Sequence, residues 1–404
     1  MSYSSTKENY LNDYKKRIQT EEFSKIEFFR EDIEFWFDIY TKFKSEQTVF
    51  YDKENPRIIY KILDFKDVKS SEKINHYTKH HGKNFYLNLH FKGLKNKFKR
   101  LHLPLRFLTT KEKSIVSILK KHDPSFPKDE KNKKKYFNQK RKSLRSQTGQ
   151  SNFIEKGFNI YMKYKTFLDK HIKNFNIPKE IIALGFLESS FNDEAISRSN
   201  AAGIWQFIPL IGSTMMPTRT KNYDLRVNPF ISSLAAFRLI LENYNMLQSW
   251  NLAIIAYNSG IKHIKKAQKK YGSKISIDQL FSLNNKNIGY ASKSYLAEFY
   301  ALTRILAYSD EIYPHIKSEK DNVFSDIKIY LSKCSLNLKK FNSSLMNLNK
   351  QFKGKKKNFP RGTFVTSHEK LSPKKYYKML DKNIPKIRAK KWIRYLKNKK
   401  CGKN

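Results

Sequence analysis

The first candidate for chemistry is a single acid, Glu188, inside the apolar run ALGFLESSF at residues 183–191. Counted at helical spacing, it falls on one stripe with four apolar residues: Ile177, Ile181, Leu184 and Phe191. Burial among such side chains is expected to raise the pKa of the acid, because it disfavours the charged form. An acid protonated near neutral pH can protonate the bridging oxygen of a glycosidic bond. The structural alternative is that Glu188 pairs with a buried arginine or caps a neighbouring helix.

Side chains suited to binding a sugar follow this acid. The segment AISRSNAAGIWQFIP at 195–209 combines Ser197 with a turn of small residues, an indole and the amide of Gln206. Small residues let the backbone approach a sugar, an aromatic plane can stack on it, and an amide gives directional hydrogen bonds. Farther along, AYNSG places Tyr257 and Asn258 at the end of an apolar run, from where both could reach a cleft. Alternatively, the two amides satisfy buried backbone groups and Ser197 caps a helix.

The combination of ESSF, AAGIWQFIP and AYNSG resembles the lytic transglycosylases of the lysozyme-like superfamily, and most closely their membrane-bound type D group. The resemblance covers residues 151–310 and implies that Glu188 is the catalytic acid. The substrate-contacting residues that it implies are Ser197, Gln206, Tyr257, Asn258 and Tyr295. The segment before Tyr295 reads ASKS, where family members often carry Glu-Thr-Arg, so the chain departs from the pattern there. The stretch DLRVNPF at 224–230 resembles one that aligns the following helix, and we interpret it as structural.

The reaction that the resemblance implies is cleavage of the bond between N-acetylmuramic acid and N-acetylglucosamine without water. Glu188 would protonate the glycosidic oxygen and then, as a carboxylate, accept the proton of the muramoyl C6 hydroxyl. That hydroxyl attacks C1 and leaves a 1,6-anhydro sugar. The resemblance implies peptidoglycan glycan strands as the substrate, and neither a metal nor a cofactor.

Two alternatives stay open at the level of the sequence. A goose-type muramidase hydrolyses the same polymer and needs a second acid to activate water. The candidates for that acid are Asp193, Glu194 and Asp224. The other alternative is an inactive protein that keeps the fold and binds wall polymer or nucleic acid through its basic surface.

The composition limits the partners and the compartment. The chain has 404 residues, with 81 Lys and Arg against 36 Asp and Glu and a net charge of +45, which favours an anionic membrane or wall polymer as a partner. The basic residues are spread along the whole chain, as a biased nucleotide composition would produce, so we expect no specific nucleic-acid binding. Two cysteines, Cys334 and Cys401, indicate neither a disulfide framework nor a metal site.

Targeting signals are not visible in the sequence. The apolar runs fall far short of the roughly 18 residues that span a bilayer, and the first residues do not resemble a signal peptide. The family resemblance nevertheless implies the cell envelope or periplasm as the place of action. We expect a monomer.

The elements that position the candidate residues are predicted to be mainly α-helical. We expect a lysozyme-like (goose-type or SLT) catalytic domain at 151–310, after a mixed or helical extension at 1–150 that ends in a basic linker. A basic region without a complete LysM module follows at 311–404. Within the catalytic domain, apolar spacing predicts helices at 153–172, at 177–191 with Pro178 in its first turn, and at 233–247, 250–272 and 292–309.

The flanking regions give weaker patterns. Alternating apolar residues predict strands at 58–65 and 84–91, and the segment 35–43 fits either a helix or a strand. A helix is expected at 111–121, followed by a linker or exposed loop at 120–142, where aliphatic residues are almost absent. Toward the end of the chain, we expect short helices at 329–349, a basic loop at 351–362 and a broken helix at 374–400.

Overall fold

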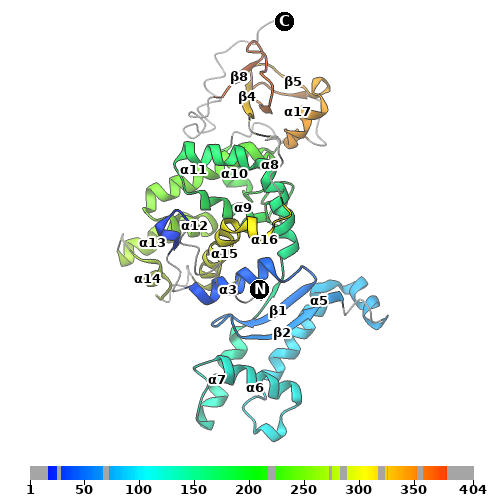
Figure 1. The fold of residues 1–404 in the computed structure, drawn as a ribbon, viewed down its shortest axis with the longest axis vertical. Helices are drawn as coiled ribbons and strands as arrows, with labels where there is room; N and C mark the ends of the chain where they lie inside the picture. The colour runs from blue at the N-terminus through cyan, green and yellow to red at the C-terminus, as the bar shows by residue number, and fades with distance from the viewer. Residues whose placement is uncertain are drawn as a thin grey trace. The chain divides into compact units, whose positions relative to one another are not determined.

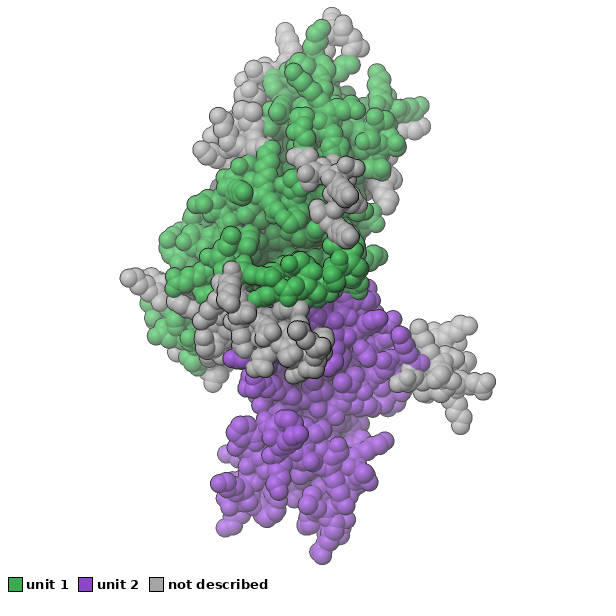
Figure 2. Space-filling model, viewed as in Figure 1, with its two compact units in different colours: residues 1–25, 154–404 green, residues 26–153 purple. Residues whose placement is uncertain are grey.

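The computed structural model describes residues 17–24, 29–66, 72–216, 224–272, 275–282, 289–316, 324, 326–352 and 358–379. The chain divides into two compact units (Figure 2). Unit 1 comprises residues 1–25 and 154–404, and unit 2 comprises residues 26–153. Unit 2 is therefore inserted, in sequence, between a short N-terminal segment and the remainder of unit 1. The domain limits expected at 150 and 310 stay predictions.

Unit 2 combines a small antiparallel sheet with helices (Figure 1). The sheet has the order β2-β1-β3, with the strands at Ile59–Asp64, Gln47–Asp52 and Leu144–Thr148. The helices are α3 (Arg30–Thr41), α5 (Glu72–Phe98), η3 (Leu105–Phe107), α6 (Thr110–His122) and α7 (Glu130–Ser143). The predicted strand at 58–65 and the predicted helix at 111–121 are confirmed as β2 and α6, and the segment 35–43 is largely helical.

The predicted strand at 84–91 is wrong, because these residues lie in α5. Alternation would place residues 85, 87, 89 and 91 on one buried face, but the Leu89 side chain is 58% exposed. Leu87 and Phe91 instead continue into the buried Leu94 and Phe98, a helical spacing of four, three and four residues. Eight residues are too few to distinguish the two-residue period of a strand from the 3.6-residue period of a helix.

The predicted linker at 120–142 is also wrong, because α7 occupies most of it. Two adjacent aromatic residues, Tyr136 and Phe137, are buried in the core of unit 2 with Leu119 and Leu144. Aromatic side chains each bury a large apolar area, so two of them anchor a helix that has almost no aliphatic residues.

Unit 1 contains the helical region that was predicted as catalytic, and its helical content confirms the mainly α fold class. The long helices are α8 (Ser151–Phe175), α11 (Pro229–Leu247), α12 (Trp250–Ser259), α13 (Ile261–Tyr271) and α15 (Tyr290–Ala307). The short helices are α2 (Glu21–Ser24), η4 (Lys179–Ile181), α9 (Ile182–Ser189), α10 (Pro209–Met215), η5 (Leu225–Val227), α14 (Ile277–Ser282) and α16 (Ser309–Ile312). Both α9 and α12 pack against α15 (Figure 1).

Two predicted helices of unit 1 have different limits in the structure. The helix expected at 250–272 is two helices, α12 and α13, which are separated at Gly260 with φ of 85°. The helix that carries Glu188 was predicted to begin at residue 177, but α9 begins at Ile182. Pro178 instead precedes the 3-10 turn η4, which leads into α9.

The C-terminal part of unit 1 contains strands where short helices were expected. One sheet has the order β7-β4-β8, with the strands at Phe364–Ser367, Lys328–Ser332 and Tyr376–Lys378, and β5 (Leu336–Asn337) pairs with β6 (Asn358–Phe359). Short helical turns lie between them: η6 (Leu338–Lys340), α17 (Ser343–Asn347) and η7 (Lys350–Phe352). The prediction failed at β4 because its pairing partner β7 is remote in sequence. The predicted loop at 351–362 is described only in part, and most of the predicted broken helix at 374–400 lies outside the described residues.

Three further findings bear on the compartment and on bound metals. Cys334 is disulfide-bonded, although no disulfide framework was expected. Among the helices that the structure describes, none is long and apolar enough to cross a membrane. In the same described residues, no group of three or more His, Cys, Asp or Glu side chains could hold a metal ion.

Candidate active site

Glu188 lies in the last turn of α9, and the first five residues of this helix, 182–186, are apolar and buried. Its side chain is only partly exposed, and burial raises its pKa from 4.5 to about 7. The Tyr295 hydroxyl donates a 2.6 Å hydrogen bond to Glu188 Oε1, which opposes the shift because it favours the carboxylate. Within the described part of the chain, Glu188 has no ion-pair partner, so the alternative of a buried arginine is not what is found. The expected raised pKa is therefore present.

Two tyrosines from different helices surround this acid. Tyr295 projects from α15 and is buried, and burial together with the nearby Glu188 raises its pKa well above 10. Tyr257 projects from α12, and burial and Glu188 raise its pKa in the same way. Both phenols therefore stay protonated and can serve as hydrogen-bond donors. The Tyr257 hydroxyl donates to the backbone oxygen of Trp205 at 2.8 Å, which connects α12 to the loop that carries Gln206.

The end of α9 adopts backbone conformations that side chains normally avoid. Ser190 and Phe191 both have left-handed φ angles, of 51° and 58°. The backbone N–H groups of these two residues donate to the carbonyl oxygens of Phe186 and Gly185, which ends the helix at Ser189, one residue after Glu188. The Phe191 ring is fully buried, so packing compensates the backbone strain and fixes the position of the acid.

The loop at 195–207 folds back on itself beside α9. Ala202 forms antiparallel bridges with both Ile196 and Phe207. Gly203 has φ of 74°, and a Cβ atom there would lie 2.1 Å from the carbonyl oxygen of Arg226, so only glycine fits. Gln206 also has a positive φ, of 45°. Left-handed residues cluster here as they do at the end of α9, a pattern common at functional sites.

The other predicted contact residues have local partners in this loop or lie on the surface. The Gln206 side-chain amide donates to the carbonyl oxygens of Gly203 and Ala195, at 2.9 and 3.3 Å. The Ser197 hydroxyl accepts a hydrogen bond from the Ala201 N–H, at 2.9 Å. Asn258 is exposed in the last turn of α12. The structure thus brings Glu188, Tyr257 and Tyr295 together, and the catalytic or substrate-binding roles of all six residues stay predictions.

The indole of this loop belongs to the core. Trp205 is fully buried, its Nε1–H donates to Ser233 Oγ at 2.9 Å, and its ring packs edge-on against Phe237. A ring that is enclosed by protein offers no face to a sugar. The interpretation of Trp205 as a stacking surface for the substrate is therefore wrong.

Two residues that hold the site together were not identified from the sequence. The Ser189 hydroxyl donates to the carbonyl oxygen of Ile204 at 2.9 Å, which ties α9 to the loop. The Arg226 guanidinium donates to the carbonyl oxygens of Asn200 and Phe207, at 2.6 and 2.8 Å. Arg226 lies in DLRVNPF, so the interpretation of that stretch as structural agrees with these contacts.

The three acids considered for a hydrolytic mechanism each have another partner. Asp193 is buried, accepts a hydrogen bond from the Tyr164 hydroxyl and pairs with Lys350, both at 2.7 Å. Glu194 lies 3.7 Å from the same lysine. Asp224 caps η5 and pairs with Arg226.

Comparison with known proteins agrees with this geometry. The family model described as the transglycosylase SLT domain matches residues 167–280. Residues 167–280 form a transglycosylase SLT domain. The predicted resemblance to SLT-type transglycosylases is thereby confirmed for these residues. The SLT domain contains Glu188 and Tyr257, whereas Tyr295 lies beyond its matched limit.

Two known proteins are similar in sequence to part of the chain, and the matched part covers a different share of each. The membrane-bound lytic murein transglycosylase D of Escherichia coli (strain K12) is 33% identical over 144 residues, which are 35% of this chain and 31% of the relative. The putative tributyltin chloride resistance protein of Alteromonas sp. (strain M-1) is 28% identical over 105 residues, or 26% of this chain and 51% of the relative. The chain thus spans about a third to a half of these relatives.

Proposed function

We propose that the chain is a peptidoglycan lytic transglycosylase that cleaves the bond between N-acetylmuramic acid and N-acetylglucosamine and leaves 1,6-anhydro ends. The observation that carries the proposal is Glu188 in the SLT domain, with a pKa of about 7 and a hydrogen bond from Tyr295. A relative that is 33% identical over 144 residues of the chain is named a membrane-bound lytic murein transglycosylase.

The proposed mechanism uses Glu188 twice. A pKa near 7 leaves a large protonated fraction at neutral pH, so Glu188 can protonate the glycosidic oxygen as the bond breaks. The resulting carboxylate then accepts the proton of the muramoyl C6 hydroxyl, whose oxygen attacks C1. One carboxyl group suffices, because the nucleophile belongs to the substrate. The hydrogen bond from Tyr295 stabilises the carboxylate between the two steps.

The substitution Glu188→Gln tests this proposal. It removes the transferable proton but keeps the size of the side chain and a hydrogen-bond acceptor for Tyr295. We expect release of anhydro-muropeptides from purified sacculi to fall by at least about 10²-fold, while binding to sacculi is retained. Sacculus digestion by the variant at the unmutated rate would contradict the assignment of Glu188.

The products distinguish this reaction from hydrolysis. Asp193, Glu194 and Asp224 all have structural partners, so we propose that none of them activates water. Mass spectrometry of the digest would then show 1,6-anhydro ends. Reducing ends in their place would support a goose-type muramidase.

We further propose action in the cell envelope, as a monomer on glycan strands. The name of the Escherichia coli relative includes the words membrane-bound, and a disulfide at Cys334 is typical of an oxidising compartment. Exposed lysines on α6 and α7 provide a surface for an anionic membrane or wall polymer: Lys111, Lys113, Lys120, Lys121, Lys131, Lys134 and Lys135. Binding to sacculi or to anionic vesicles that does not weaken as salt is raised would contradict an electrostatic contact.

A further inference from the structure

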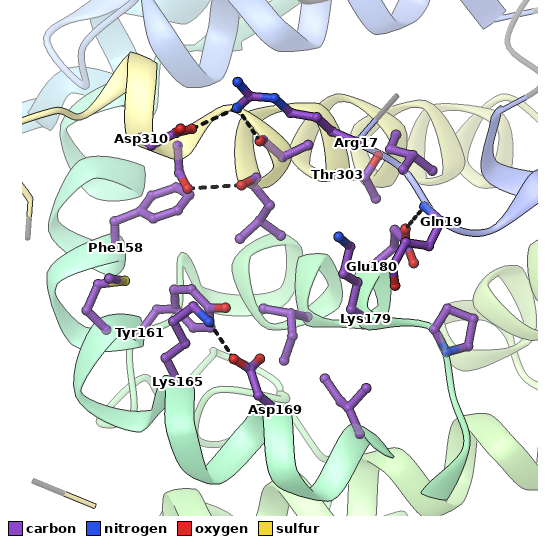
Figure 3. Close-up of a pocket in the computed structure, with 18 of the residues that line it drawn as sticks. Arg17, Gln19, Phe158, Tyr161, Lys165, Asp169, Lys179, Glu180, Thr303 and Asp310 are labelled. Atoms are coloured by element: carbon purple, nitrogen blue, oxygen red, sulfur yellow. Dashed lines mark hydrogen bonds and ion pairs between the residues drawn. The ribbon is translucent and has the colours of Figure 1, made fainter. Parts of the chain in front are cut away.

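The segment at residues 17–24, which we call the N-terminal strap, contacts α12 and α15, which carry Tyr257 and Tyr295, and the turn η4 that leads into α9, which carries Glu188. It precedes unit 2 in the sequence, so more than a hundred residues separate it from these elements. At its first residue, Arg17 donates to the carbonyl oxygen of Ala307 at 3.1 Å and pairs with Asp310 at 2.9 Å. These contacts fix the strap to the end of α15 and to α16 (Figure 3).

The strap also binds the turn that leads into the acid-bearing helix. Glu180 of η4 is buried and accepts the N–H of Gln19 at 2.8 Å (Figure 3). It also accepts the hydroxyl of Thr20 at 3.1 Å. Because η4 continues directly into α9, these bonds fix the beginning of the helix that ends at Glu188.

Glu22 caps a third element, α12, from a distant part of the chain. Its carboxylate accepts the N–H groups of Trp250 and Asn251, at 2.9 and 3.0 Å, and the hydroxyl of Ser249. The first N–H groups of a helix have no partner within the helix, and a carboxylate there also complements the helix dipole. The same helix carries Tyr257 in its last turn.

An aromatic residue secures the strap beside this carboxylate. Phe23 is fully buried and packs edge-on against Phe299 of α15, with ring centroids 5.2 Å apart. The neighbouring Tyr300 donates to Asn251 Oδ1 at 2.9 Å, so α12 and α15 meet where the strap binds.

A cavity lies beside these contacts. It has a volume of about 960 Å³, and its wall includes Ile18 of the strap, Tyr161 of α8, Ile182 of α9 and Leu306 of α15 (Figure 3). Glu188 is not part of its lining. The strap therefore forms part of the wall of a space that α8, α9 and α15 also line.

We propose that the N-terminal strap is a positioning element of the active site and that Glu22 is its principal positioning residue. By capping α12, Glu22 sets where Tyr257 lies relative to Glu188. The inference rests on the proposed transglycosylase function. Displacement of a site residue by about 1 Å can lower a rate about 10²-fold, so a cap outside the site is sufficient to affect catalysis.

The substitution Glu22→Ala tests this inference in the full chain. We expect kcat for anhydro-muropeptide release from solubilised glycan strands to fall about 10- to 100-fold, with KM within about twofold of the unmutated value. Glu22→Gln keeps one oxygen that accepts backbone N–H groups but replaces the other with a donor, so its kcat should lie between those of Glu22→Ala and the unmutated chain. The control is Glu21→Ala, which removes an exposed carboxylate from the same short helix and should leave kcat unchanged.

Circular dichroism at the assay temperature separates positioning from loss of folding. A Glu22→Ala variant with unchanged kcat, or with a fall in activity that follows its unfolded fraction, overturns the inference. If this variant does not fold, Glu22→Gln decides: a folded variant with kcat lowered at least about threefold supports the inference, and an unchanged kcat overturns it. Absence of anhydro products from the unmutated chain would instead remove the proposed function, and the inference with it.

Discussion

Glu188 links catalysis to stability at the scale of a single residue. Its pKa is about 7 in the folded chain and about 4.5 when exposed, so the folded state binds the proton more tightly. The stabilisation from this proton is complete below pH 4.5 and is lost as the pH rises through 7. At pH 8 the folded unit must hold a poorly solvated carboxylate.

We therefore expect Glu188→Gln to stabilise the protein at pH 8, by ~1–3 kcal/mol, because the amide has no charge to solvate. At pH 4 the two proteins should differ little. Urea unfolding at both values measures the difference. The control is Glu194→Gln, at an exposed carboxylate, which should show no comparable gain with pH. An equal effect of Glu188→Gln at both values would contradict the raised pKa.

Tyr295 and Tyr257 make different contributions to the same site. Tyr295 donates to Glu188 and lowers its pKa, whereas Tyr257 donates to the carbonyl oxygen of Trp205. Tyr295→Phe should therefore raise the pKa of Glu188 and move the alkaline limb of the rate-against-pH curve to higher pH. Tyr257→Phe should lower the rate without moving that limb. A limb that moves equally in both variants would show that the hydrogen bond from Tyr295 does not set the pKa.

At the scale of elements, two glycines near the site differ in whether a side chain would fit at their position. Both Gly203 and Gly260 have positive φ angles, of 74° and 85°. A Cβ atom at Gly260 would meet nothing within 4 Å, whereas at Gly203 it would collide with the carbonyl oxygen of Arg226. Gly260→Ala should cost only the backbone term of ~1–2 kcal/mol. Gly203→Ala should cost about 3 kcal/mol or more and also abolish activity, because the loop must move. Equal costs in denaturant unfolding would contradict this geometry.

The same elements show what the sequence could predict. Helices at 153–172 and 292–309 were found as α8 and α15, because their apolar spacing persists over many turns. The break at Gly260 was missed, although a glycine after AYNS is a common helix end. The enclosure of Glu188 followed from its apolar neighbours. Its hydrogen-bond partner Tyr295 came from the family resemblance, because the residues are 107 positions apart.

Contacts across long stretches of sequence account for most of what was missed. The cap from Glu22 joins residues 228 positions apart, and no local pattern marks a glutamate as the cap of a distant helix. Likewise, β4 was predicted as helix because its pairing with β7 depends on a segment more than thirty residues away. Local periodicity identifies elements, whereas their connections depend on the tertiary fold.

At the scale of the whole molecule, unit 2 has a buried ionic centre of its own. Lys140 pairs with Asp52 at 3.2 Å and with Asp123, and the hydroxyls of Tyr60 and Tyr136 donate to the same two carboxylates. Burial alone would raise the pKa of Asp123, but the hydrogen bonds from Lys140, Ser125 and Tyr136 outweigh it and lower this pKa to about 2. Removal of the cation would leave two buried carboxylates without a counter-ion.

Because each unit has its own core, thermal unfolding should occur in two transitions, and each substitution should move only one of them. Lys140→Met should destabilise unit 2 by ~3–5 kcal/mol, since the buried aspartates lose their partner while the apolar volume is kept. Glu188→Gln at pH 8 should raise only the transition of unit 1. Scanning calorimetry of the full chain, with the fragment 26–153 alone to assign the transitions, measures both shifts. If both substitutions moved a single transition instead, the two units would unfold together, which would contradict this prediction.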